Sequence, residues 1–173
     1  MPNDAQEEHI SARFFLSTLL VSSFTEDDLF ARINLVRGAL EYIFFVRRAP
    51  PSVELFEEYC KNNEVSAGMR DETVKAYGEA VRGLSAQDIN DFFSLAETVA
   101  GAFPRLIMST AVSLPNDIMS PIGRWVRRNL GQEILIRALT DPELGGGCTF
   151  LWNGVYHDFS FRRSLGEHRG DMA

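Results

Sequence analysis

The dipeptide Asn153-Gly154 constrains the fold of this 173-residue chain more than any other feature, because it separates two runs of alternating side chains. A two-residue type I′ turn needs a positive φ angle at both positions, and asparagine and glycine tolerate that conformation. The sequence therefore predicts a β-hairpin whose register is symmetric about the turn. The predicted cross-strand pairs are Trp152 with Val155, Leu151 with Tyr156, Phe150 with His157, and Cys148 with Phe159. One face should carry Cys148, Phe150, Trp152, Val155, His157 and Phe159, and the other Thr149, Leu151, Tyr156, Asp158 and Ser160.

Two further strands and a helix are predicted ahead of the hairpin. Side chains alternate over residues 108–114 and again over residues 134–139, which is the period of a strand. A helix between them is indicated by apolar residues at helical spacing, namely Ile118, Ile122, Trp125, Val126 and Leu130, with Gly131 at its C-cap. Pro121 fits this helix if Ser120 is the cap and the proline is the first helical residue. With a short helix over residues 161–167, residues 106–173 form a small α/β lobe.

Residues 1–105 indicate a bundle of short helices. Thr25 and the acidic residues after it cap a helix that ends before Pro50, and its apolar side is Leu29, Ile33, Val36, Leu40 and Ile43. Ser52 opens the next helix, and another is predicted over residues 70–82. Ser85 and Asp88 cap the last helix, which is followed by Pro104. A helix over residues 9–23 precedes them all, with an apolar side of Ile10, Phe14, Leu16, Leu19, Leu20 and Val21.

Charge is distributed unevenly between these two parts. The chain has 17 Lys and Arg against 24 Asp and Glu, a net charge of −7, and residues 1–105 alone hold ten basic and seventeen acidic residues. An acidic surface disfavours nucleic-acid backbones and anionic lipid. The first residues do not resemble a signal peptide, and the longest apolar cluster, residues 14–21, is too short to cross a hydrocarbon core of about 30 Å. We therefore expect no nucleic-acid partner, and membrane association only through partners.

Several residues with chemical potential fit structural roles. Cys60 and Cys148 are too few for a disulfide framework, and we interpret both as buried small residues in a reducing compartment. His157 is interpreted as a half-buried hairpin residue beside Phe150. Asp141 is predicted to be a turn former that accepts hydrogen bonds from backbone N–H groups.

An ordered set of residues in the last third resembles a known family. The set comprises residues 110–114, Asn129-Leu130-Gly131, Asp141-Pro142-Glu143-Leu144, Gly145-Gly146, the turn, Asp158-Phe159-Ser160 and Leu165. In this order the residues resemble the C-terminal part of the delta subunit of bacterial F-type ATP synthase, whose mitochondrial counterpart is the oligomycin-sensitivity-conferring protein. The resemblance covers residues 106–166, and the chain length suits the whole subunit. The motif residues that it implies are structural: Asp141, Pro142, Leu144, Gly145, Gly146, Gly154, Asp158, Ser160 and Leu165.

The resemblance implies an α+β fold, with an N-terminal bundle of short helices over residues 1–105 and a small α/β domain over residues 106–173 that contains the C-terminal hairpin. It implies a non-catalytic peripheral-stalk subunit at the cytoplasmic face of the cell membrane. The helical lobe would bind N-terminal segments of the alpha subunits, and the C-terminal lobe the end of the b subunit, so that proton flow is coupled to ATP synthesis. No catalytic residue, cofactor or metal is implied. The alternative is a free-standing helical adaptor that binds another amphipathic peptide.

Enzyme chemistry has weaker support in the sequence. His157, Asp158 and Ser160 have the residue types of a catalytic triad, but neighbouring side chains of a strand point to opposite faces. The glycine run that begins at Gly145 lacks the Lys and Ser or Thr that follow a phosphate loop. The histidines have no spacing that gathers a metal site. A small hydrolase that uses Cys148 or Ser160 is the weakest alternative.

Overall fold

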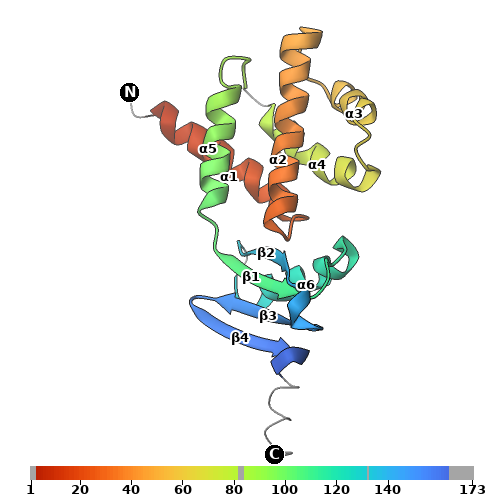
Figure 1. Cartoon of the computed structure of the whole chain (residues 1–173). Helices are drawn as coiled ribbons and strands as arrows, with labels where there is room; N and C mark the ends of the chain where they lie inside the picture. Colours follow the sequence, from red (N-terminus) through yellow and green to blue (C-terminus); the bar gives the residue numbers. More distant parts are fainter. Residues whose placement is uncertain (1–2, 82–83, 132, 164–173) are drawn as a thin grey trace, which may run out of the picture. The chain divides into compact units, whose positions relative to one another are not determined.

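The structure is a computed structural model that describes residues 3–81, 84–131 and 133–163. The chain forms two compact units, one of Met1–Ser23 with Asp28–Ala102 and the other of Phe24–Asp27 with Phe103–Ala173. Figure 1 follows the chain from the helices of the first unit to the strands of the second. The predicted α+β class with N-terminal helices is confirmed.

The first unit consists of helices around an apolar core. They are α1 (Asn3–Leu20), α2 (Glu26–Glu41), the π-helix η1 (Tyr42–Arg47), α3 (Val53–Asn62), α4 (Ala67–Ala80) and α5 (Ile89–Gly101). The predicted apolar side of α2 and η1 is confirmed, since Leu29, Ile33, Val36, Leu40 and Ile43 are fully buried. Phe15 of α1 packs edge-on against Phe93 of α5, and Phe56 of α3 stacks on Tyr77 of α4.

The buried side of the first helix matches the prediction only in part. Leu16, Leu19 and Leu20 of the predicted apolar side are buried, but Phe14 and Val21 are 56% and 78% exposed. Ala12 and Phe15, which the prediction did not include, are fully buried. Residues 12, 15 and 19 lie on one stripe of a helix with 3.6 residues per turn, which leaves Phe14 on the outside.

Two helix starts also differ from the prediction. α4 begins at Ala67, ahead of the predicted residue 70. The reason is that Ser66 Oγ accepts a hydrogen bond from the Met69 N–H and caps the helix. α5 begins only at Ile89, because the Ser85 hydroxyl and N–H donate to Asp88 and hold a turn ahead of the helix.

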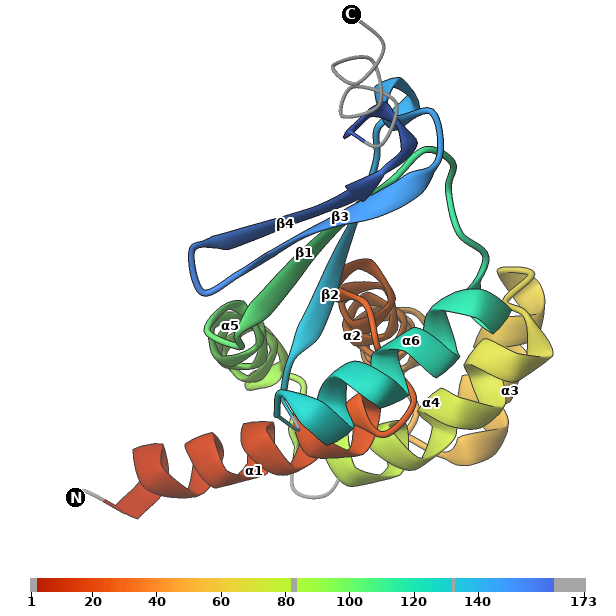
Figure 2. The ribbon, with the colours of Figure 1, turned by 90° about the horizontal axis from the view of Figure 1, so that it is seen from below.

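Within the described residues of the second unit, four strands form one sheet in the order β2-β1-β3-β4 (Figure 2). They are β1 (Arg105–Thr110), β2 (Leu135–Thr140), β3 (Gly147–Trp152) and β4 (Val155–Ser160). β1 is parallel to β2 and antiparallel to β3. The first strand was predicted to run to residue 114, but β1 ends at Thr110. There the Thr110 hydroxyl donates to the Val112 carbonyl, and the Val112 side chain is exposed.

α6 (Asn116–Asn129) covers one face of this sheet. The core between them comprises Leu106, Met108, Met119, Val126, Ile134 and Ile136. Pro121 lies inside the helix, so the predicted late start at Ser120 is wrong. The first turn forms ahead of the proline, since the N–H groups of Ile118 and Met119 both donate to the Pro115 carbonyl. Part of the predicted apolar stripe is exposed, namely Ile118, Trp125 and Leu130.

The predicted C-terminal helix falls mostly outside the described residues. Residues 161–163 are helical, and residues 164–167 lie outside the described ranges. Across the part of the chain that the structure describes, no helix combines the length and the apolar character needed to cross a membrane.

Candidate functional site

The predicted hairpin and its register are confirmed. Asn153 and Gly154 have φ angles of 49° and 79°, as a type I′ turn requires. The observed pairs include Trp152 with Val155, Leu151 with Tyr156, Phe150 with His157, and Cys148 with Phe159. This register places Phe150 and Trp152 on the side of α6, where both pack against the core.

Residues 141–147 connect β2 to β3 through a compact turn. Asp141 Oδ1 accepts a hydrogen bond of 3.0 Å from the Glu143 N–H and caps the 3₁₀ helix η2 (Pro142–Leu144). Pro142 occupies the first helical position, where an N–H would have no partner within the helix. Leu144 is buried, and Gly145 ends the turn with a φ of 68°. Each of these residues therefore has a structural role in the turn.

Two further glycines allow the turn to approach the end of β4. The Phe161 N–H donates to the Gly146 carbonyl at 3.1 Å. A Cβ atom on Gly146 would lie 2.5 Å from the Phe161 ring. A Cβ atom on Gly147 would lie 2.2 Å from the Phe159 carbonyl oxygen, and the φ angle of Gly147 is +74°. Both positions therefore require glycine.

Some backbone groups on the outer edge of β4, at Asp158 and Ser160, have hydrogen-bond partners nearby in the sequence. In this hairpin, residues 156, 158 and 160 direct their backbone groups away from β3. The Ser160 N–H donates to Asp158 Oδ1 at 2.8 Å, and the Arg163 guanidinium donates to the Asp158 carbonyl at 3.3 Å. Hydrogen bonds from the Ser160 hydroxyl and N–H hold the pKa of Asp158 below its ordinary value. Local groups thus engage part of an edge that could otherwise pair with another strand.

Most of the predicted motif residues meet in one place, which we call the glycine corner (residues 141–147 and 158–163). Gly154 lies at the other end of the hairpin, and Leu165 lies outside the described residues. The carboxylates of Asp141 and Asp158 are both engaged by backbone N–H groups. The glycine corner therefore holds the hairpin to the turn that precedes it.

The side chains of His157, Asp158 and Ser160 do not come together as a catalytic triad would. His157 lies on the α6 side of the sheet and stacks on Phe159, with ring centroids 6.3 Å apart and planes 10° from parallel. Asp158 and Ser160 lie on the opposite face, as alternation along a strand requires. The interpretation of His157 as half-buried is wrong, because it is exposed on the outermost strand, which contributes nothing to the core beneath α6.

The cysteines and the acidic residues do not gather into a reactive site. Cys60 is buried and Cys148 half-buried, and burial raises the pKa of both thiols. A raised pKa disfavours the thiolate, which is the nucleophilic form. Among the described residues, no three or more His, Cys, Asp or Glu side chains are grouped so that they could hold a metal ion.

The second unit presents an apolar surface on β4. Val155 and Phe159 lie on the same face as the core beneath α6, but they are 54% and 63% exposed. His157 lies between them and completes this surface, which we call the β4 patch (Val155, His157 and Phe159). One helix is about 10 Å wide and strands are about 4.8 Å apart, so α6 can cover only part of the sheet. The β4 patch therefore lies outside the part of the sheet that α6 covers.

The first unit presents exposed apolar side chains on and just after α1. Phe14 and Ser17 are exposed on the helix, and the exposed Val21 follows in the turn directly after its last residue, Leu20. The hydroxyls of Ser17 and Thr18 donate to the Phe14 carbonyl at 2.7 and 3.1 Å. Their donor groups are therefore satisfied within the helix, and the α1 stripe (Phe14, Ser17 and Val21) offers mainly apolar contact.

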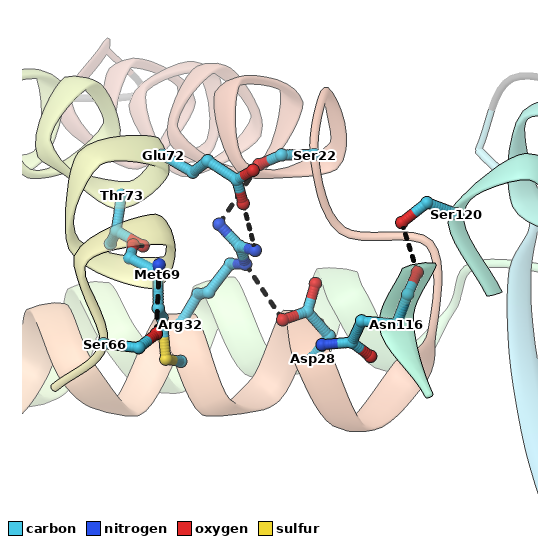
Figure 3. A network of polar contacts seen from close by, with 9 residues as sticks. All are labelled: Ser22, Asp28, Arg32, Ser66, Met69, Glu72, Thr73, Asn116 and Ser120. Carbon is cyan, nitrogen blue, oxygen red and sulfur yellow. Dashed lines mark hydrogen bonds and ion pairs between the residues drawn. The ribbon is translucent and has the colours of Figure 1, made fainter. Parts of the chain in front are cut away.

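Sequence reasoning missed a buried arginine that connects three helices. Arg32 is 5% exposed, and Figure 3 shows its guanidinium between Ser22, Asp28 and Glu72. Its Nε donates to Asp28 at 3.1 Å, its Nη1 to Ser22 at 3.2 Å, and its Nη2 to Glu72. The available signal was a charged residue next to Ile33 on the apolar side of α2. This network fixes the α1–α2 corner against α4.

Comparison with known proteins adds no relative. No protein-family model matches the chain, and no curated protein matches it. The functional argument therefore depends on the residues, surfaces and contacts described above.

Proposed function

We propose that this chain is a non-catalytic peripheral-stalk subunit of an F-type ATP synthase, a counterpart of the delta subunit. In this role it links the alpha subunits of the catalytic head to the b-subunit stalk. The linkage holds the head still against the rotor, so that proton flow is coupled to ATP synthesis. The chain works at the cytoplasmic face of the cell membrane, held there by its partners, and it needs no cofactor.

The observation that carries this proposal is the way in which the two units are connected. The chain crosses from one unit to the other after Ser23, after Asp27 and after Ala102. A subunit that transmits torque needs two binding surfaces that are joined by more than one stretch of chain. Three covalent connections between a helical unit and a sheet unit support such a mechanical role.

Each unit also offers one surface suited to an amphipathic helix. We assign the α1 stripe, on the acidic helical unit, to the N-terminal helical segment of an alpha subunit. We assign the β4 patch to the C-terminal end of the b subunit. Helices that dock by an apolar face use anchors at helical spacing, and both surfaces present such apolar contact.

Binding of the two peptides to the full chain tests both assignments at once. Titration calorimetry should detect binding of an alpha N-terminal peptide and of a b C-terminal peptide. Val21→Glu should weaken the alpha peptide by about tenfold or more and leave the b peptide unchanged, because buried anchors contribute about 1–4 kcal/mol each. Phe159→Ser should have the opposite pattern. Each variant is thus the matched control for the other.

The outcomes separate the assignments from the function. If Val21→Glu weakens only the b peptide, the partners are reversed between the units. If both peptides bind but neither variant has an effect, the surfaces are wrong and the function stands. If neither peptide binds the wild-type chain, the peripheral-stalk proposal fails and the helical adaptor replaces it.

Nucleotide binding gives an independent test. A ligand present at a hundred times its dissociation constant would stabilise the folded chain by about 2.7 kcal/mol. We expect no shift of the thermal unfolding midpoint with millimolar ATP, and no ATP hydrolysis by the purified chain. A clear stabilisation or turnover would contradict a purely mechanical role.

A further inference from the structure

The second unit contains a short segment from far away in the sequence. Phe24–Asp27, between α1 and α2, belongs to the same unit as the sheet. The Ile136 N–H donates to the Phe24 carbonyl at 3.0 Å, and Thr25 forms a parallel bridge with Ile136. One backbone hydrogen bond and one isolated bridge therefore join the segment to the outer edge of β2, which is the kind of contact that an added peptide makes with a sheet edge.

The Phe24 side chain occupies a slot on α6. Its ring centroid lies 4.8 Å from the guanidinium carbon of Arg127 and 6.0 Å from that of Arg124. A Cβ atom on Gly123 would lie 2.4 Å from the Cβ atom of Phe24. Glycine in a helix interior costs about 1 kcal/mol relative to alanine, and here it makes room for the ring. Arg127 is itself held in place, since its Nε donates to the Ile134 carbonyl at 3.2 Å.

The Glu26 carboxylate binds arginines from two neighbouring strands. Arg137 of β2 makes two hydrogen bonds to it, from Nε at 2.6 Å and from Nη2 at 3.0 Å. Arg105 of β1 makes a third, from Nε at 2.8 Å. A paired contact of this kind recognises a carboxylate by geometry as well as by charge.

Backbone pairing, an aromatic slot and an arginine pair are the separate elements of a peptide-binding site. We propose that the second unit contains a binding groove for a segment in which an aromatic residue lies two positions before a glutamate that begins a helix. The chain fills this groove with its own Phe24, Thr25 and Glu26. The groove is a separable recognition site, so it accepts the same chemistry from a separate peptide when the internal segment is weakened. This inference does not depend on the proposed function.

A full-length double variant, Phe24→Ala with Glu26→Gln, tests the proposal. The probe is a fluorescent synthetic peptide with the sequence of residues 20–30, and binding is followed by anisotropy. We expect the peptide to bind the double variant and to restore the slowed hydrogen exchange of the Ile136 amide. Wild-type chain should bind the peptide more weakly than the double variant does, by about tenfold or more. The reason is that the internal segment competes for the groove at an effective concentration in the millimolar range.

Four controls define the site. The peptide with Phe24→Ala, and the peptide with Glu26→Gln, should each bind the double variant about tenfold more weakly. Gly123→Ala added to the double variant closes the slot and should abolish binding. Glu143→Gln removes a carboxylate whose Oε2 lies 3.6 Å from Arg162 Nη1 on the surface of the same unit. Added to the double variant, it should leave peptide binding unchanged.

Two results would overturn the proposal. One is a double variant that folds, as judged by circular dichroism and by slow exchange in β1, but binds no peptide at millimolar concentration. The other is a double variant, and a Glu26→Gln single variant, that both fail to fold. In that case Phe24 and Glu26 are inseparable parts of the core, and the second unit has no separate groove.

Discussion

At the scale of single residues, Arg32 is the buried polar side chain on which we expect the free energy of unfolding to depend most. It is 5% exposed and donates hydrogen bonds to Asp28, Ser22 and Glu72, which belong to different helices or their ends. Arg32→Met keeps the aliphatic stem and removes all three bonds. We expect it to lower the free energy of unfolding by about 1–3 kcal/mol in a urea titration.

Arg37→Met is the matched control for this prediction. Arg37 also lies on α2 and binds Glu41, Glu97 and Asn90, but its side chain is 32% exposed. Exposed ion pairs contribute at most about 1 kcal/mol, so its loss should be the smaller. Equal losses for the two variants would contradict the role assigned to burial.

The lowered pKa of Glu26 makes the free energy of unfolding depend on pH below the ordinary carboxylate pKa. Hydrogen bonds from Arg137 and then from Arg105 hold its pKa down at about 2, from an ordinary 4.5. A lowered folded-state pKa gives stability that is present above the ordinary pKa and is lost as the pH falls through the folded value. The stability of wild-type chain should therefore fall between pH 4.5 and about 2 more steeply than that of Glu26→Gln. Parallel curves from pH-dependent urea titrations would count against this pairing.

At the scale of elements, the hairpin depends on its turn. Gly154 has a φ angle of 79°, and no atom lies within 4 Å of the position of a Cβ, so only backbone strain opposes a side chain there. Gly154→Val should destabilise by about 1–2 kcal/mol, because a β-branched residue is strained at positive φ. Gly154→Asn should cost clearly less, because asparagine tolerates that conformation. Similar losses for both variants in urea titrations would mean that the turn conformation is not what matters.

At the scale of the whole molecule, the position of Phe24–Asp27 predicts an asymmetry between fragments. The core of the first unit is internal to it, so residues 1–105 expressed alone should be helical and unfold cooperatively. Residues 103–173 expressed alone lack Phe24 and the bridge to Ile136, and should unfold with weak cooperativity. Thermal unfolding followed by circular dichroism measures both. A C-terminal fragment that melts as sharply as the N-terminal one would show that Phe24–Asp27 is dispensable to the sheet.

Local signals in the sequence were sufficient for the hairpin, its register, the buried side of α2 and the turn at Asp141. Each depends on a property of neighbouring residues, such as the φ preference of Asn153 and Gly154 or the spacing of apolar side chains. Such properties act within one element and can be inferred from the sequence without knowledge of the fold. The resemblance of the motif residues to a family remains a prediction about function.

Tertiary packing decided which faces of the elements are buried, because burial depends on the other elements that pack against a face. Alternation identifies the two faces of β4 but does not say that α6 leaves Phe159 exposed, and helical spacing does not say which side of α1 is covered. The close approach of Phe24 to Gly123 joins residues about a hundred positions apart, and no local pattern encodes it. Local sequence therefore specified the hairpin with its register and the buried side of α2, while the partners of Arg32, Phe24 and Glu26 were settled only when distant segments came together.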